Sequence, residues 1–185
     1  MAVAAVTAGS RVTNFLGCPF EAMGNTMATY GGQNVGAKKL DRLDTGLKSC
    51  LMLGVGYSMI ALLVAIFFGR FLALLFLDAS ETALIGDVQR YLLFNTAAYT
   101  LLAFVNIVRF LIQGMGFSKF AILAGVLEMI ARSLVAFLLV PRFGFTGTCL
   151  GNPVAWIFAD AFLIPAYFHV KKVLQRHLEQ GREVS

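Results

Sequence analysis

Two charged side chains lie in the middle of a strongly apolar stretch, residues 118–140, "SKFAILAGVLEMIARSLVAFLLV". Glu128 and Arg132 are four residues apart, so on an α-helix they share one face and can form an ion pair. Such a pair can be structural and orient the helix, or Glu128 can be a titrating group that belongs to the protein's activity. Because charges in an apolar interior are costly, we treat both residues as candidate functional residues.

Two further charged residues occupy comparable positions. Asp160 lies near the midpoint of the apolar stretch 150–172 and has no charged residue within one helical turn. It can form hydrogen bonds between helices, or it can hold a proton or another cation. Arg109 lies nearer one end of the apolar stretch 91–113, where its long side chain can extend past the end of the stretch or close that end by pairing with another group.

The remaining reactive residues do not indicate an enzyme or a metal site. His169 lies at the basic end of the last apolar stretch and His177 follows that stretch, so no Ser/His/Asp or Cys/His set is visible. The three cysteines are odd in number and widely spaced, which argues against a disulfide framework or a CxxC metal site. Tyr30, Tyr99 and Trp156 can be read as an aromatic cage, but such residues are more often interface anchors or core residues. We expect no enzymatic activity, metal or cofactor.

The composition is that of a membrane protein. Apolar residues make up 58% and charged residues 14% of the chain, and the mean hydropathy is +0.77, whereas soluble domains are about half apolar and a quarter charged. At about 20 residues per crossing, 185 residues suffice for five or six membrane-spanning helices. The net charge of +5 lies in short clusters beside apolar stretches, which argues against nucleic-acid binding.

The expected fold is an all-α, polytopic transmembrane helix bundle with about five full spans and a truncated N-terminal helix. Residues 1–14 read as the tail of that truncated helix, residues 15–175 as the transmembrane lobe, and residues 176–185 as a cytoplasmic tail. The spans are expected at residues 15–37, 46–77, 91–113, 118–140 and 150–172, with a short amphipathic helix at the membrane interface over 78–90. We expect Pro165 to kink or break the last span.

The first span, 15–37, is only weakly hydrophobic and rich in small residues. Gly32 and Gly36 have the GxxxG spacing of closely packed membrane helices, so this span is expected between other helices or beside a wet cavity. Its end, "GGQNVGAKKLDR", lacks the GxxxxGK[ST] spacing of a phosphate-binding loop. Gln33 and Asn34 are therefore expected to be packing or gate residues at a helix end.

The loop charges predict the orientation of the bundle. Basic residues follow the first span, separate the third from the fourth, and follow the fifth, and these three regions share one side if every segment crosses. The opposite side receives the acidic stretch "DASETALIGD". By the positive-inside rule, the C-terminus is cytoplasmic, in the plasma or inner membrane.

Four motifs in order resemble a known family. The stretches "GQNVGAKKLDR", "NIVRFLIQGMG", "EMIAR" and "PRFGFTG" resemble the multidrug and toxic compound extrusion (MATE) transporters over nearly the whole chain, from the end of the seventh helix through the twelfth. The resemblance implies a C-terminal lobe that pairs with an N-terminal six-helix lobe around a central cavity. It further implies export of organic cations or amphiphilic molecules in exchange for H⁺ or Na⁺, with membrane lipid around the bundle.

The resemblance narrows the choice of coupling residues. Some branches of the family place one carboxylate on the seventh helix and another on the tenth. By the resemblance, the segment 91–113 corresponds to the tenth helix, and it contains no Asp or Glu. Glu128 and Asp160, together with Arg132 and Arg109, are thus the candidates for coupling or for the substrate cavity. Two alternatives to the exporter stay open: a non-transporting membrane module or assembly partner, and a lipid-linked saccharide flippase of the same superfamily, which would need a larger and more basic cavity.

Overall fold

The computed structural model describes residues 2–74 and 82–179. All regular secondary structure in these residues is helical, which confirms the expected all-α class. The helices are α1 (Ala2–Gly36), α2 (Asp41–Leu74), α3 (Thr82–Ala97), α4 (Tyr99–Gly114), α5 (Ser118–Leu138), α6 (Val140–Phe143), α7 (Phe145–Cys149) and α8 (Gly151–Glu179).

Several of these helices are long and apolar enough to cross a membrane. Three stretches meet both conditions, namely α2, α5 and the stretch Phe145–Glu179, and the bent pair α3–α4 is a fourth if it forms one span. Helix α1 has 35 residues, about 52 Å at 1.5 Å per residue, but it is not among the helices that are apolar enough to meet the second condition. The membrane bundle is therefore confirmed, while the count of five spans stays a prediction.

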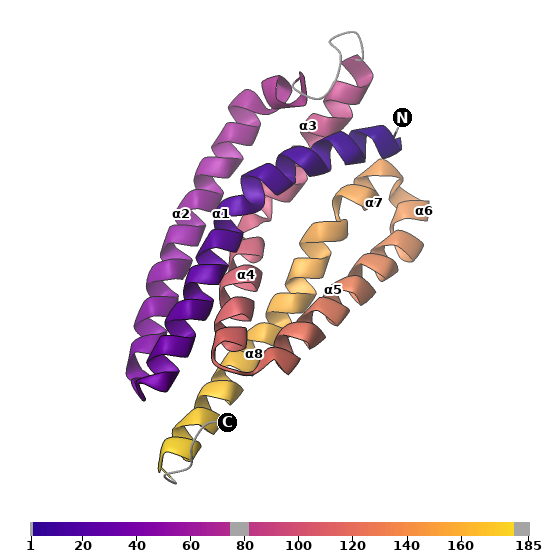
Figure 1. Ribbon diagram of the computed structural model, residues 1–185. Coiled ribbons are helices and arrows are strands. Elements are labelled where there is room, and N and C mark those ends of the chain that lie inside the picture. The colour runs from indigo at the N-terminus through magenta and orange to yellow at the C-terminus, as the bar shows by residue number, and fades with distance from the viewer. Residues whose placement is uncertain (1, 75–81, 180–185) are drawn as a thin grey trace.

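Helix α1 joins two pieces that we expected to be separate. Residues 2–14 do not form the tail of one helix followed by a new span at residue 15, because α1 runs without interruption to Gly36 (Figure 1). No glycine or proline lies at residues 11–16, where it could end a helix near residue 14. Pro19 lies inside the continuous helix α1. The boundary expected at residue 14 is therefore absent.

Two other expected boundaries also differ. Residues 82–90 continue directly into 91–97 as α3, and the break falls at Ala98, where α3 and α4 meet at 51°. Residues 78–81 of the expected interfacial helix lie outside the described residues. Pro165 does not break α8, which continues from Gly151 to Glu179, since neighbouring groups in a packed membrane helix can compensate for the missing N–H.

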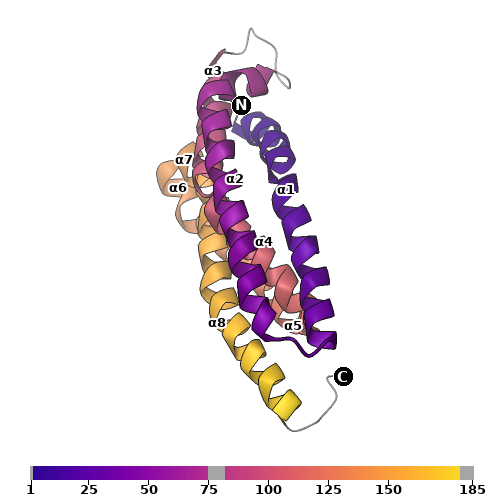
Figure 2. The same cartoon turned by 90° about the vertical axis from the view of Figure 1, so that its left-hand side faces the viewer.

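The bundle has a central helix with a pair of neighbours on either side. Helix α4 packs against α1 and α2 on one side and against α5 and α8 on the other. Figures 1 and 2 show the α1–α2 turn, the α4–α5 turn and the end of α8 at the same end of the bundle, with α6, α7 and the N-terminus at the other. The three basic regions thus share one end, as the loop charges predicted, although the side of the membrane that this end faces stays a prediction.

The contact between α1 and α4 depends on small residues. A methyl group added at Gly114 would lie 2.1 Å from the carbonyl oxygen of Ala28, and one at Gly31 would lie 2.7 Å from the side chain of Leu111. Gly32 takes part, because its added methyl would lie 3.2 Å from the Gly114 carbonyl oxygen. Gly36 does not, since among the described residues nothing lies within 4 Å of such a methyl. Of the two glycines with the GxxxG spacing, Gly32 thus lies in this contact between α1 and α4, which we call the glycine seam.

Candidate functional site

The centre of the bundle holds Glu128 between two arginines. Glu128 and Arg132 come from successive turns of α5, and the Arg132 guanidinium donates a hydrogen bond of 2.9 Å to Glu128 Oε2. Arg109 from α4 forms an ion pair with the other carboxylate oxygen, Oε1. The Glu128 side chain is 9% exposed, compared with 21% for Arg109 and 45% for Arg132. The sequence therefore predicted one of the two partners of the carboxylate correctly.

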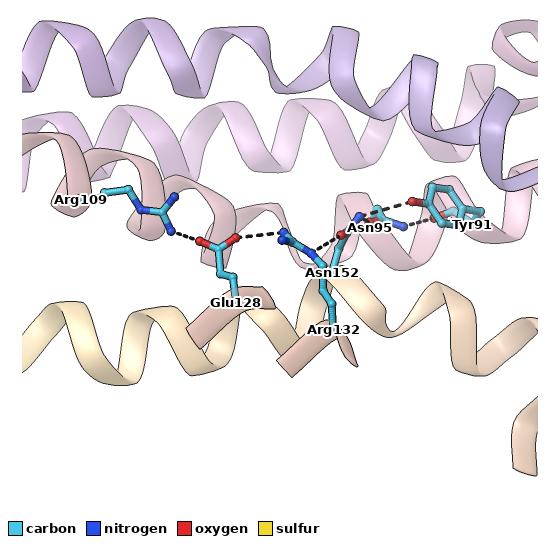
Figure 3. Close-up of polar contacts among 6 residues, drawn as sticks. All are labelled: Tyr91, Asn95, Arg109, Glu128, Arg132 and Asn152. Carbon is cyan, nitrogen blue, oxygen red and sulfur yellow. Dashed lines mark hydrogen bonds and ion pairs between the residues drawn. The ribbon is translucent and has the colours of Figure 1, made fainter. Parts of the chain in front are cut away.

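The ion pairs continue into a line of neutral polar groups (Figure 3). Arg132 Nε donates a hydrogen bond of 3.3 Å to the side-chain oxygen of Asn152, at the start of α8. The Asn152 amide donates one of 2.9 Å to the side-chain oxygen of Asn95 and one of 3.3 Å to the Tyr91 hydroxyl, both on α3. We call this set the polar network: Arg109, Glu128, Arg132, Asn152, Asn95 and Tyr91.

The polar network borders a cavity of about 230 Å³. Helix α1 contributes Glu21 to the lining, so two carboxylates and two guanidiniums share the cavity and their formal charges balance. Glu21 is exposed. The cavity is lined by Thr13, Asn14, Gly17, Glu21, Asn95, Tyr99, Leu102, Val105, Asn106, Arg109, Glu128, Arg132, Asn152 and Trp156.

Aromatic residues form one wall of this cavity. Tyr99 is 1% exposed and donates a hydrogen bond of 2.8 Å to the Thr13 carbonyl oxygen on α1. Its ring centroid lies 5.4 Å from that of Phe20 and 6.3 Å from that of Trp156. Tyr30 is not part of this group, because its hydroxyl donates to the Arg42 carbonyl oxygen near the α1–α2 turn. The three aromatic residues considered as a cage are thus not brought together.

Asp160 lies elsewhere on α8, two turns beyond Asn152. It is buried, and its Oδ1 has no hydrogen-bond partner among the described residues. Its charge lies close enough to that of Arg109 to interact with it, but among the described residues Asp160 takes no part in the hydrogen bonds and ion pairs of the polar network. The structure thus separates the two candidate carboxylates into one that is paired and one that is not.

The residues predicted at the end of α1 have different surroundings. Asn34 is buried and donates a hydrogen bond of 2.8 Å to the Tyr30 carbonyl oxygen, one turn earlier. Gln33 is exposed. Together with the placement of Gly32 in the glycine seam and of Gly36 outside it, this makes Asn34 and Gly32 the residues that contribute to packing at this end.

Sequence reasoning missed several members of the site. Asn95 and Asn152 are polar residues that lie within apolar stretches of the sequence. This position is the one sequence feature that could have marked them as members of the site. Their partners lie on other helices, so no spacing along the chain connects them. A second missed contact joins α2 to α8, where Asp44 accepts a hydrogen bond of 2.7 Å from Tyr167 and pairs with Lys171.

The charges of this arrangement compensate one another, because Glu128 is paired with both Arg109 and Arg132. No group of three His, Cys, Asp or Glu side chains placed to hold a metal ion occurs in residues 2–74 and 82–179. A buried carboxylate that already binds two guanidiniums has its charge compensated. Uptake of H⁺ or Na⁺ by Glu128 must therefore weaken its contact with at least one arginine.

Comparison with protein families identifies the class. The MatE family model matches residues 1–138, about three quarters of the sequence, and this stretch includes Arg109, Glu128 and Arg132. The chain therefore belongs to the MatE family, as its motifs indicated, and is a member of a superfamily of membrane transporters. No curated protein and no solved structure matches it significantly. Asn152 and Asp160 lie beyond the matched residues.

Proposed function

We propose that this chain is the C-terminal lobe of an exporter coupled to H⁺ or Na⁺, and that Glu128 takes up the coupling cation. The observation that carries the proposal is the burial of Glu128 between Arg109 and Arg132 on the wall of a polar cavity. Buried ionisable groups in membrane helices are costly and commonly belong to ion or proton pathways. The membership of the MatE family supports transport.

Charge compensation explains how one site can serve an exchange. When Glu128 is ionised, it neutralises part of the charge of the two guanidiniums. When Glu128 binds a cation, the positive charge beside the cavity rises by one unit, which disfavours a cationic substrate there. Binding of the coupling cation to Glu128 and binding of a positively charged substrate in the cavity therefore exclude each other. Antiport requires such mutual exclusion.

The finer parts of the proposal follow the family. The substrates are organic cations or amphiphilic molecules, the partner is an N-terminal six-helix lobe, and the protein lies in the plasma or inner membrane with the basic end of the bundle in the cytoplasm. Alternating access arises from tilting of the two lobes about the central cavity. Within this lobe, the cavity of about 230 Å³ has two acidic and two basic residues in its lining. This balance favours an exporter of cations over a saccharide-lipid flippase, since a polyanionic lipid headgroup needs an excess of basic residues.

The test is efflux of a fluorescent cationic dye from cells or proteoliposomes that carry the transporter containing this chain. Glu128→Gln keeps the size of the side chain but removes its charge, and we expect it to abolish efflux driven by a proton or sodium gradient. Ser133→Ala is the matched control on the same helix, because the Ser133 hydroxyl bonds only to the Met129 carbonyl of its own helix in the described structure. Asp160→Asn measures how far efflux depends on the second candidate carboxylate.

The outcomes separate the alternatives. Loss of efflux in Glu128→Gln with normal membrane insertion supports coupling at Glu128. Efflux equal to that of Ser133→Ala would remove Glu128 from the mechanism. Absence of efflux in the wild type itself, with every dye tested, would favour the non-transporting module.

A further inference from the structure

The junction of α3 and α4 is a bend without a proline or glycine. The helices meet at 51°, and the sequence around the break is "FNTAAYT". Asn95 Nδ2 donates to the Tyr91 carbonyl oxygen at 2.9 Å, and Thr96 Oγ1 donates to the Leu92 carbonyl oxygen at 2.8 Å. Side chains that bond to carbonyls one turn earlier weaken the backbone ladder and bend helices. The two half-helices of this span are therefore joined at Ala98 by a bend that side chains, and not a proline or glycine, accompany.

Asn152 connects this bend to α8. Its amide donates to the side-chain oxygen of Asn95, three residues before the break at Ala98. Asn95 is fully buried, and among the described residues its side-chain oxygen accepts a hydrogen bond from Asn152. Loss of this hydrogen bond leaves a buried acceptor unsatisfied, which is the costly kind of loss. The position of α3 thus depends on the orientation of one side chain at the start of α8.

The orientation of Asn152 depends in turn on Arg132. The side-chain oxygen of Asn152 accepts from Arg132 Nε, and this fixes which end of the amide faces α3. Arg132 is held on its other side by Glu128 Oε2. Arg132 is 45% exposed and borders the cavity, so the Glu128 carboxylate and the Asn152 oxygen are the polar partners that restrain its guanidinium, and removal of the carboxylate charge weakens one of these two restraints.

We propose that Asn152 is a positioning residue that transmits the charge state of Glu128 to the bend between α3 and α4. With Glu128 ionised, Arg132 and Asn152 hold α3 against α8. With a cation on Glu128, Arg132 releases Asn152, the contact with Asn95 is lost, and the bend changes. This inference rests on the proposed role of Glu128, and it adds the route by which that role reaches a moving part.

The charged groups around Glu128 come from every neighbouring helix. Arg109 lies on α4 and Arg132 on α5, Glu21 of α1 lines the same cavity, and Asp160 of α8 is buried in the surroundings of Arg109. A response to pH can therefore arise at Glu128, Glu21 or Asp160. Variants of these carboxylates are needed to assign it.

Trp156 offers a direct readout of the bend. It is the single tryptophan of the sequence, it is 6% exposed, and its ring lies beside that of Tyr99, the first residue after the break. The experiment follows tryptophan emission of the purified 185-residue chain in lipid nanodiscs during two titrations, acid without Na⁺ and NaCl at constant pH and ionic strength. The variants are Glu128→Gln, Asn152→Leu and Asn95→Leu.

We expect the wild type to change its emission in at least one titration and Glu128→Gln to lose that change. Asn152→Leu and Asn95→Leu should lose it as well, although Glu128 is intact in both. Asn25→Leu is the matched control, because Asn25 is exposed on α1 and lies outside the polar network; it should behave as the wild type. Glu21→Gln and Asp160→Asn should keep the change.

Three results would count against the proposal in distinguishable ways. A full response in Asn95→Leu and Asn152→Leu, with none in Glu128→Gln, would overturn the role of Asn152 and leave the coupling role of Glu128 intact. If Glu128→Gln responds as the wild type does, or if the wild type does not respond, both the role of Asn152 and the coupling role of Glu128 are overturned. The two asparagines lie on different helices, so if one variant fails to fold by circular dichroism, the other still decides.

Discussion

The glycine seam and the polar network hold the same bundle together by different means. In the seam, backbone approaches backbone so closely that a methyl group at Gly114 would lie 2.1 Å from the Ala28 carbonyl oxygen. In the polar network, α3, α4, α5 and α8 are joined by charges and amides around a cavity. Close packing has one good arrangement, whereas hydrogen bonds can exchange partners. On our proposal, the seam is the fixed part of the bundle and the network is the adjustable part.

The largest effect is expected from breaking the network at its centre. Glu128→Leu leaves Arg109 and Arg132 without their shared anion, and loss of one partner of a buried ion pair costs about 3 kcal/mol of stability. The free energy of unfolding in detergent measures this cost.

A compensated variant sharpens the result. Replacement of all three residues, Glu128→Leu with Arg109→Met and Arg132→Met, removes the unpaired charges and should recover most of the stability, because apolar residues of similar volume often replace a buried ionic group well. Transport should stay lost in this variant. Recovery of transport together with stability would show that the charges serve only the fold.

A smaller effect is expected in the seam. Gly114→Ala places a methyl group against backbone that cannot move aside, and we expect a loss of about 2 kcal/mol from overpacking. Gly125→Ala is the matched control on α5, since a methyl there meets nothing within 4 Å among the described residues. It should gain up to about 1 kcal/mol from helix propensity. Equal stabilities of the two variants would contradict the assignment of Gly114 to a close contact.

The smallest effect is expected where α2 meets α8. The Asp44 side chain is 43% exposed, so its pair with Lys171 should contribute less than about 1 kcal/mol despite the additional hydrogen bond from Tyr167. A double-mutant cycle with Asp44→Asn and Lys171→Gln, measured at low and high salt, isolates the pair. A coupling energy between Asp44 and Lys171 that is well above this value and does not change with salt would contradict the prediction.

Sequence patterns predicted those features that depend on neighbours along one helix. The spacing of Glu128 and Arg132 predicted their contact, and the apolar stretches predicted α2, α5 and α8. Arg109 was among the candidate residues, but its pairing with Glu128 could not be predicted because the two residues lie on different helices, and the same holds for the contacts of Asn152. Pairing between helices is decided by how they pack, and the chain carries no local signal for it.

The errors in the boundaries have a common cause. Hydropathy marks where a helix can lie in lipid, but it does not mark where a helix begins or bends. Helix α1 is weakly apolar and continuous, so residues 2–14 were separated from the rest without a structural break. The bend at Ala98 has no proline or glycine and depends on side chains that bond to their own backbone. Pro165, a conspicuous helix breaker, lies inside a continuous α8.

Infrared difference spectroscopy of the purified protein tests most directly whether Glu128 takes up the coupling cation. Spectra recorded with and without the cation report the loss or shift of a carboxylate band. We predict such a band in the wild type and in Asp160→Asn, and its absence in Glu128→Gln. The same difference spectrum in the wild type and Glu128→Gln would show that the cation binds elsewhere, and the account of the polar network as a coupling site would be wrong.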